Sequence, residues 1–265
     1  MKKLKILIPV FIVLAILGGV IFFKNKNKKE EAPKQIETRK IEQINKLALK
    51  DRPFVTLTPR SDGKEVTLSV DKVTNATTAE YELEYQTDTL IQGVFGTLDF
   101  NDKDMPLSKD LLFGSCSKGK CRYDEGVIGG SLTMRFDGGD EPYTLKSDFN
   151  LQNMVDKKGV FTSKDLRATL DVGTSLSSSA FVLIAHTMGL PDEVKETVMA
   201  GPYAFLSATS PVLKNTIVTF KSNQDLTGAK ILFWDGNAWE ELEVELSEGQ
   251  ISAPTTSLGT FVLVK

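Results

Sequence analysis

The chain has 265 residues, with 32 Lys and Arg, 35 Asp and Glu, and a formal net charge of −3. Three basic residues precede residue 24, and residues 24–50 hold nine basic and four acidic ones, so the remaining 20 basic and 31 acidic residues give residues 51–265 a net charge of −11. An acidic surface of this strength repels phosphate backbones, which argues against nucleic acid as a ligand of the folded part.

The first predicted element is a membrane-spanning helix. Residues 6–23 form an uncharged, apolar run, which as a helix would measure about 27 Å, close to the thickness of a bilayer's hydrocarbon core. No Ala-x-Ala cleavage pattern follows the run, no cysteine lies near its end, and it exceeds the roughly 7–15 apolar residues of a signal peptide. We therefore expect residues 1–23 to be a retained signal-anchor in the lipid bilayer.

Residues 24–50 are predicted to be a charged stalk or linker. They carry a net charge of +5, and their first lysines follow the apolar run closely enough to contact anionic lipid head groups. Ile41, Ile44 and Leu47 fall on one helical face, which predicts a short helix after Pro33. Lysines on both sides of the apolar run nearly balance, so charge alone does not orient the anchor.

Residues 51–157 have the pattern of a β-sandwich. Short runs of alternating apolar and polar residues are separated by turn signals such as Ser61-Asp62-Gly63. The predicted strands are 54–59, 65–70, 79–87, 90–98, 110–116, 121–126, 131–136 and 143–152. Eight short strands over about a hundred residues are typical of an immunoglobulin-like or fibronectin-type-III-like domain.

A polar stretch near residue 157 marks the predicted boundary to a second β-sandwich domain, residues 158–265. Its predicted strands are 179–186, 215–220, 229–234, 239–246 and 259–264. Residues 191–200 have weak helical signals and are expected to be a loop. The predicted fold class is all-β: an N-terminal transmembrane helix and stalk followed by two immunoglobulin-like β-sandwich domains.

Cys116 and Cys121 are the two cysteines of the chain. Four residues separate them, a spacing that can close a tight hairpin with a disulfide in an oxidising compartment. The alternative is a pair of buried thiols. The same segment matches Gly-x4-Gly-Lys of a phosphate-binding loop, but Cys121 replaces the required Ser or Thr, and Arg122 and Tyr123 predict a strand rather than a helix.

Trp234 and Trp239 flank the turn sequence Asp235-Gly236-Asn237-Ala238. A hairpin closed here would place the two indole rings opposite each other on one sheet face, where aromatic pairs stabilise a sheet. The alternative is an exposed ligand platform on which sugar rings stack.

No residue pattern indicates a catalytic centre. His186 is the single histidine and ends an apolar strand, so we expect a structural or exposed side chain rather than a metal ligand or a general base. The acidic segment 99–104 lacks the central glycine and the later glutamate of a calcium loop. Carboxylates are plentiful, but no spacing singles out an acid/base pair. We therefore expect no catalytic residues, no metal and no cofactor.

Two segments resemble known families. The stretches 201–205, 215–220, 229–242 and 256–264 resemble β-sandwich modules near the ends of many bacterial surface proteins. The stretches 55–70 and 81–87, with the cysteine hairpin, resemble a fibronectin-type-III-like domain of uncharacterised membrane-anchored bacterial proteins. This resemblance implies a single-pass, extracellular architecture and no assigned activity. The short Cys116–Cys121 loop differs from the immunoglobulin bridge, which joins two sheets, so the kinship concerns the fold only.

From these observations we expect a single-pass, membrane-anchored binding or structural protein of the bacterial envelope, non-catalytic, with its C-terminal domains outside the cytoplasm. Its expected partners are an envelope protein or a polysaccharide. One alternative is an accessory subunit of a secretion, pilus or transport assembly. The other is an envelope hydrolase that uses paired carboxylates.

Overall fold

The computed structural model describes residues 43–209 and 211–265, in which β-strands are the main regular structure. The helices in these residues are a 3-10 turn, η1 (Leu49–Asp51), and one short helix, α2 (Met154–Lys157). None of the helices in the described residues is long and apolar enough to cross a membrane. The predicted signal-anchor and the stalk as far as residue 42 lie outside the described residues. The all-β prediction is confirmed for the part that the structure describes.

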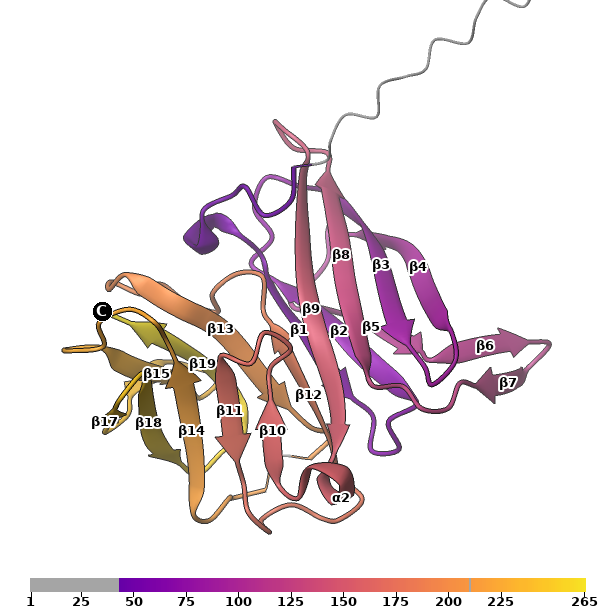
Figure 1. Cartoon of the computed structure of the whole chain (residues 1–265). Helices are drawn as coiled ribbons and strands as arrows, with labels where there is room; N and C mark the ends of the chain where they lie inside the picture. The colour runs from indigo at the N-terminus through magenta and orange to yellow at the C-terminus, as the bar shows by residue number, and fades with distance from the viewer. Residues whose placement is uncertain (1–42, 210) are drawn as a thin grey trace, which may run out of the picture. The chain divides into compact units, whose positions relative to one another are not determined.

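One large antiparallel sheet organises residues 43–265. Its nine strands lie in the order β16 (Trp239–Glu241), β15 (Lys230–Trp234), β19 (Gly259–Val264), β13 (Val198–Leu206), β12 (Phe181–His186), β9 (Tyr143–Asn153), β8 (Gly129–Asp137), β3 (Thr78–Gln86) and β4 (Ile91–Asp99) (Figure 1). The sheet therefore contains strands from both predicted domains.

Three smaller sheets complete the described fold. One has three strands, β1 (Phe54–Pro59), β2 (Glu65–Asp71) and β5 (Leu107–Leu112). Another has five, in the order β10 (Val160–Thr162), β11 (Ala168–Asp171), β14 (Thr216–Lys221), β18 (Gln250–Thr255) and β17 (Glu245–Ser247). The third is the hairpin β6 (Gly114–Ser117) and β7 (Lys120–Tyr123).

The first hydrophobic core lies between the three-stranded sheet and the β3, β8 and β9 part of the large sheet. Every second residue of β2 is buried, as the alternation of Glu65 to Asp71 predicts. Its valine and leucine side chains pack against the inner face of the large sheet, which contributes Leu83, Met134 and Phe149. This arrangement is a β-sandwich.

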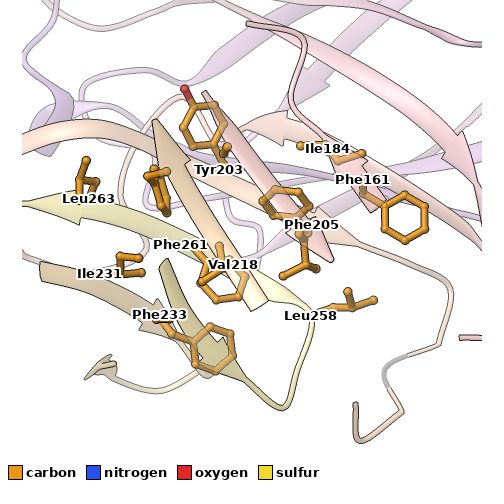
Figure 2. Packing of buried hydrophobic residues seen from close by; sticks show 14 of the residues in the cluster. Phe161, Ile184, Tyr203, Phe205, Val218, Ile231, Phe233, Leu258, Phe261 and Leu263 are labelled. Atoms are coloured by element: carbon orange, nitrogen blue, oxygen red, sulfur yellow. The ribbon is translucent and has the colours of Figure 1, made fainter. Parts of the chain in front are cut away.

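A second core lies between the five-stranded sheet and the β12, β13, β19 and β15 part of the large sheet (Figure 2). Phe161 and Val218 come from the five-stranded sheet, whereas Phe205, Ile231 and Phe261 come from the large sheet. The rings of Phe205 and Phe261 meet edge to face, with their centroids 6.1 Å apart. This half is also a β-sandwich.

Strand β12 belongs to both sandwiches. Leu183 and Ala185 pack in the first core, and Val182 and Ile184 pack in the second. Because successive side chains of a strand point to opposite faces, the three-stranded sheet and the five-stranded sheet cover opposite faces of the large sheet. β12 is therefore buried on both sides where the two sandwiches meet.

This shared sheet crosses the predicted boundary near residue 157. β9 ends at Asn153 and pairs along its second half with β12, in a register that places Leu151 opposite Leu183. The two predicted sandwiches therefore have separate cores but one hydrogen-bonded sheet. Their standing as two immunoglobulin-like domains stays a prediction.

Residues 43–46 lie beside the first half of β9, where β12 has ended. Ile44 forms a parallel bridge with Thr144, and the Asn45 side chain exchanges two hydrogen bonds of 3.0 Å with the main chain of Lys146. The predicted stalk helix is wrong for residues 43–47, which are not helical. A short isolated helix is marginally stable in water, and pairing with β9 satisfies the same main-chain groups.

Candidate functional site: surfaces of the two sandwiches

The outer face of the five-stranded sheet is hollowed. The hollow has a volume of about 590 Å³ and lies over β11, β14 and β18, with β10 and β17 at its sides. Along β10, β11, β14 and β18, the side chains on this outer face alternate with those of the second core, as the pleat of a strand requires. The residues that line the hollow include Asp171, Ile217, Thr219, Lys221, Glu245 and Ser252.

The hollow offers several kinds of contact to a ligand. The hydroxyls of Thr219 and Ser252 lie 2.9 Å apart on the neighbouring strands β14 and β18, near the middle of the sheet. Asp171 and Glu245 supply carboxylates and Lys221 supplies an ammonium group, while the Ile217 side chain is 46% exposed. Hydrogen-bonding groups of both kinds beside an apolar patch suit a ligand with many hydroxyls and an apolar ring face.

The hollow was not predicted from the sequence. The predicted strands lack β10, β11 and β18 and merge β16 and β17 into one strand, 239–246. Without these strands the five-stranded sheet is not visible. β10 and β11 have three and four residues, which is too short for an alternating pattern. Pro254 lies within β18, and a proline argues against a strand in sequence-based interpretation.

Cys116 and Cys121 are joined by a disulfide across the β6–β7 hairpin, where they are register partners. The hairpin tip and its second strand expose the basic residues Lys118, Lys120 and Arg122. At the base, Tyr123 lies near the cations of Arg60 and Lys64, at 5.5 and 5.1 Å from its ring centroid. Residues 114–123 contain no helix, so they lack the element that a phosphate-binding loop requires.

Trp234 and Trp239 are opposite each other in the β15–β16 hairpin. Their ring centroids are 5.5 Å apart and the rings meet edge to face. Both side chains are half-buried, and the Trp239 indole N–H donates a hydrogen bond to the Asp192 carbonyl at 3.2 Å. The geometry is that of a cross-strand aromatic pair, and a sugar-stacking role for the two rings stays a prediction.

His186 lies where the two sandwiches meet. Its ring is tilted over that of Tyr203, with 4.2 Å between the centroids, and its Nε2 atom lies 3.7 Å from a carboxylate oxygen of Asp165. Asp165 also accepts hydrogen bonds from the hydroxyls of Tyr203 at 2.5 Å and Ser163 at 2.6 Å. Sequence reasoning missed this cluster because its members come from separate strands and a loop.

The electrostatics of Asp165 favour a structural role. Partial burial by itself would raise the pKa of this carboxyl, but contacts with His186, Ser163 and Tyr203 outweigh burial and hold the pKa well below its usual value. A general acid needs the opposite shift, toward the working pH. Burial and the hydrogen bond to Asp165 together raise the pKa of the Tyr203 hydroxyl above its usual value.

Comparisons with models of protein families, with curated proteins and with solved structures found no match to the chain. The candidate site therefore depends on the geometry and chemistry described above.

Proposed function

We propose that this chain is a membrane-anchored, non-catalytic protein of the bacterial envelope, which binds a polysaccharide outside the cytoplasm through the hollow on its five-stranded sheet. The observation that carries the proposal is the concave sheet face, where Thr219 and Ser252 sit between the carboxylates and the lysine of the hollow.

The chemistry of the hollow supports a sugar polymer over other ligand classes. Residues 51–265 carry a net charge of −11, which repels polyanions such as nucleic acids. The hollow itself combines Asp171 and Glu245 with Lys221 and neutral hydroxyls. Hydroxyl-rich chains are both donors and acceptors, and their ring faces fit the exposed Ile217.

Two features support the proposed location. The uncharged run at residues 6–23 has the length of a membrane span. The disulfide between Cys116 and Cys121 is of a kind that persists in oxidising compartments and is rare in the cytoplasm. A folded unit outside the cytoplasm would meet envelope polysaccharide directly.

A sedimentation assay tests the proposal. The full chain, purified in detergent, is mixed with insoluble peptidoglycan, chitin or cellulose, and the protein left in the supernatant is measured. We expect wild-type protein to sediment with one of these polymers. We expect Thr219→Arg to stay in solution, because the long side chain fills the middle of the hollow.

Thr67→Arg is the matched control. Thr67 lies on the middle strand of the three-stranded sheet, and like Thr219 its hydroxyl bonds a neighbouring strand, here Asp110 at 2.7 Å. The control should sediment like the wild type. Equal sedimentation of all three proteins, or none with any of these polymers, would contradict binding in the hollow. Release of soluble sugar that a single Asp or Glu substitution abolishes would favour the hydrolase alternative.

A further inference from the structure

β4 is the last strand of the large sheet, and one of its two edges has no partner strand among the described residues. At its ends, the Thr87 N–H donates to the Leu90 carbonyl and the Phe100 N–H donates to the Thr77 carbonyl. In an antiparallel pair, such bonded positions alternate with positions whose main-chain groups point away. The even-numbered residues of β4 therefore bond β3, and the N–H and C=O groups of the odd-numbered residues point outward.

The exposed edge is uncharged and apolar. Residues 91–98 contain no charged residue and no proline, although residues 51–265 carry a net charge of −11. On the outer face, the Phe95 side chain is 82% exposed and Ile91 is 75% exposed. Natural sheet edges are usually protected by charges, prolines, bulges or covering segments. β4 pairs with β3 in a regular register along all nine residues, without a bulge. No described strand pairs with its other edge, so that edge is free to accept another strand.

We propose that β4 pairs with β4 of a second copy of this chain, antiparallel about a two-fold axis, so that two large sheets become one. The outward groups are centred on Phe95, so the axis places Phe95 opposite Phe95 and Gly93 opposite Thr97. This register uses the whole of β4 and places the two exposed phenyl rings side by side. A two-fold contact uses the same surface on both copies, which an uncharged strand permits without like charges facing each other.

The two ends of β4 have complementary charge. The β6–β7 hairpin, with Lys118 and Lys120 exposed, projects past β4 at the end of the sheet where β4 begins (Figure 1). At its other end, β4 leads into residues 99–104, which hold three aspartates and one lysine and carry a net charge of −2. Antiparallel pairing brings the beginning of one β4 beside the end of the other. The basic hairpin of each copy therefore faces the acidic loop of its partner, which favours a second copy as the occupant.

Sedimentation velocity of the full chain in detergent tests this pairing. We expect a concentration-dependent dimer for the wild type. Phe95→Lys should weaken it about tenfold, because it removes the aromatic pair and sets two ammonium groups against each other across the axis. Val212→Lys is the matched control, because Val212 is 79% exposed but lies outside the strands. It should dimerise like the wild type.

Mixing Phe95→Lys with Phe95→Glu tests the register itself. Only a two-fold axis at this residue sets lysine opposite glutamate, so the mixture should dimerise more tightly than either variant alone. Three results would overturn the proposal: a wild type that stays monomeric up to about 1 mM, a Phe95→Lys variant that dimerises like the wild type, or a mixture no tighter than its components. Thr219 lies on another sheet, so failure here leaves the polysaccharide proposal unaffected.

Discussion

Asp165 is held within the second sandwich by the hydroxyl of Tyr203, a residue of its core. The Tyr203 side chain is 1% exposed, and its hydroxyl donates to the Asp165 carboxylate. We expect Asp165→Ala to lower the free energy of unfolding by about 2 kcal/mol, because a largely buried hydroxyl loses its acceptor. Urea denaturation measures this change. Adding Tyr203→Phe to Asp165→Ala should restore part of the loss, and a further loss of similar size would contradict this account.

The lowered pKa of Asp165 also predicts a pH dependence. A carboxyl group whose pKa is lower in the folded state than in the unfolded state stabilises the fold above its unfolded pKa, near about 4. This stabilisation is lost as the pH falls toward the folded pKa. The stability difference between the wild type and Asp165→Asn should therefore be largest near neutral pH and shrink below about pH 4. Urea midpoints over this range test it, and a difference that grows in acid would contradict it.

For individual residues, contacts between residues close in the sequence could be predicted, whereas contacts between residues far apart in the sequence could not. Cys116 with Cys121 and Trp234 with Trp239 are joined by short turns, so a hairpin pattern is enough to bring each pair together. Asp165, by contrast, reaches His186 and Tyr203 only after the β12–β13 pairing has formed. No local pattern carries that information.

The β6–β7 hairpin is an element with its own two-stranded sheet. Replacing both cysteines by serine, Cys116→Ser with Cys121→Ser, should lower the free energy of unfolding by no more than about 2 kcal/mol, because the disulfide closes a very short loop. Amide hydrogen exchange should become faster within residues 114–123 and stay unchanged in β12. Reducing agent should reproduce the effect in the wild type and have none in the double variant. Faster exchange throughout the first core would contradict this expectation.

Strands with a clear pattern were predictable and the others were not. β1, β2, β3 and β4 match their predicted ranges to within a few residues, because each has at least six residues, and β1, β2 and β3 have one buried face. β13 was not predicted as a strand, since Gly201 and Pro202 interrupt its pattern, and its register with β19 shifts at this point. The predicted loop over 191–200 agrees with the structure as far as Thr197. β13 begins at Val198.

The whole unit should unfold as one body, because both cores depend on β12. Leu183 is fully buried in the first core and Ile184 is 1% exposed in the second. We expect Leu183→Ala and Ile184→Ala each to destabilise the fold by about 3 kcal/mol. In calorimetry, both variants should lower the temperature of the same single transition. Val155→Ala, at a side chain that is 65% exposed, should have little effect.

Two transitions, each shifted by only one of the core variants, would instead support two independent domains. The sequence predicted two sandwich patterns but not the sheet that joins them, because pairing between β9 and β12 spans the predicted boundary. One signal did point to it. Residues 181–185 are apolar without alternation, a pattern typical of strands that are covered on both faces.

Asn45 and Arg52 give the fold a mechanical clamp at the point where the chain enters it. The main-chain N–H and the side-chain amide of Asn45 form hydrogen bonds with the main chain of β9. The Arg52 guanidinium donates hydrogen bonds to the carbonyls of Asn45 and Leu47, at 2.6 and 2.8 Å. Tension that arrives from residue 42 along the axis of β9 loads these bonds together. Tension across that axis peels them apart in succession, so the resistance of the entry segment to force depends on the direction of the pull.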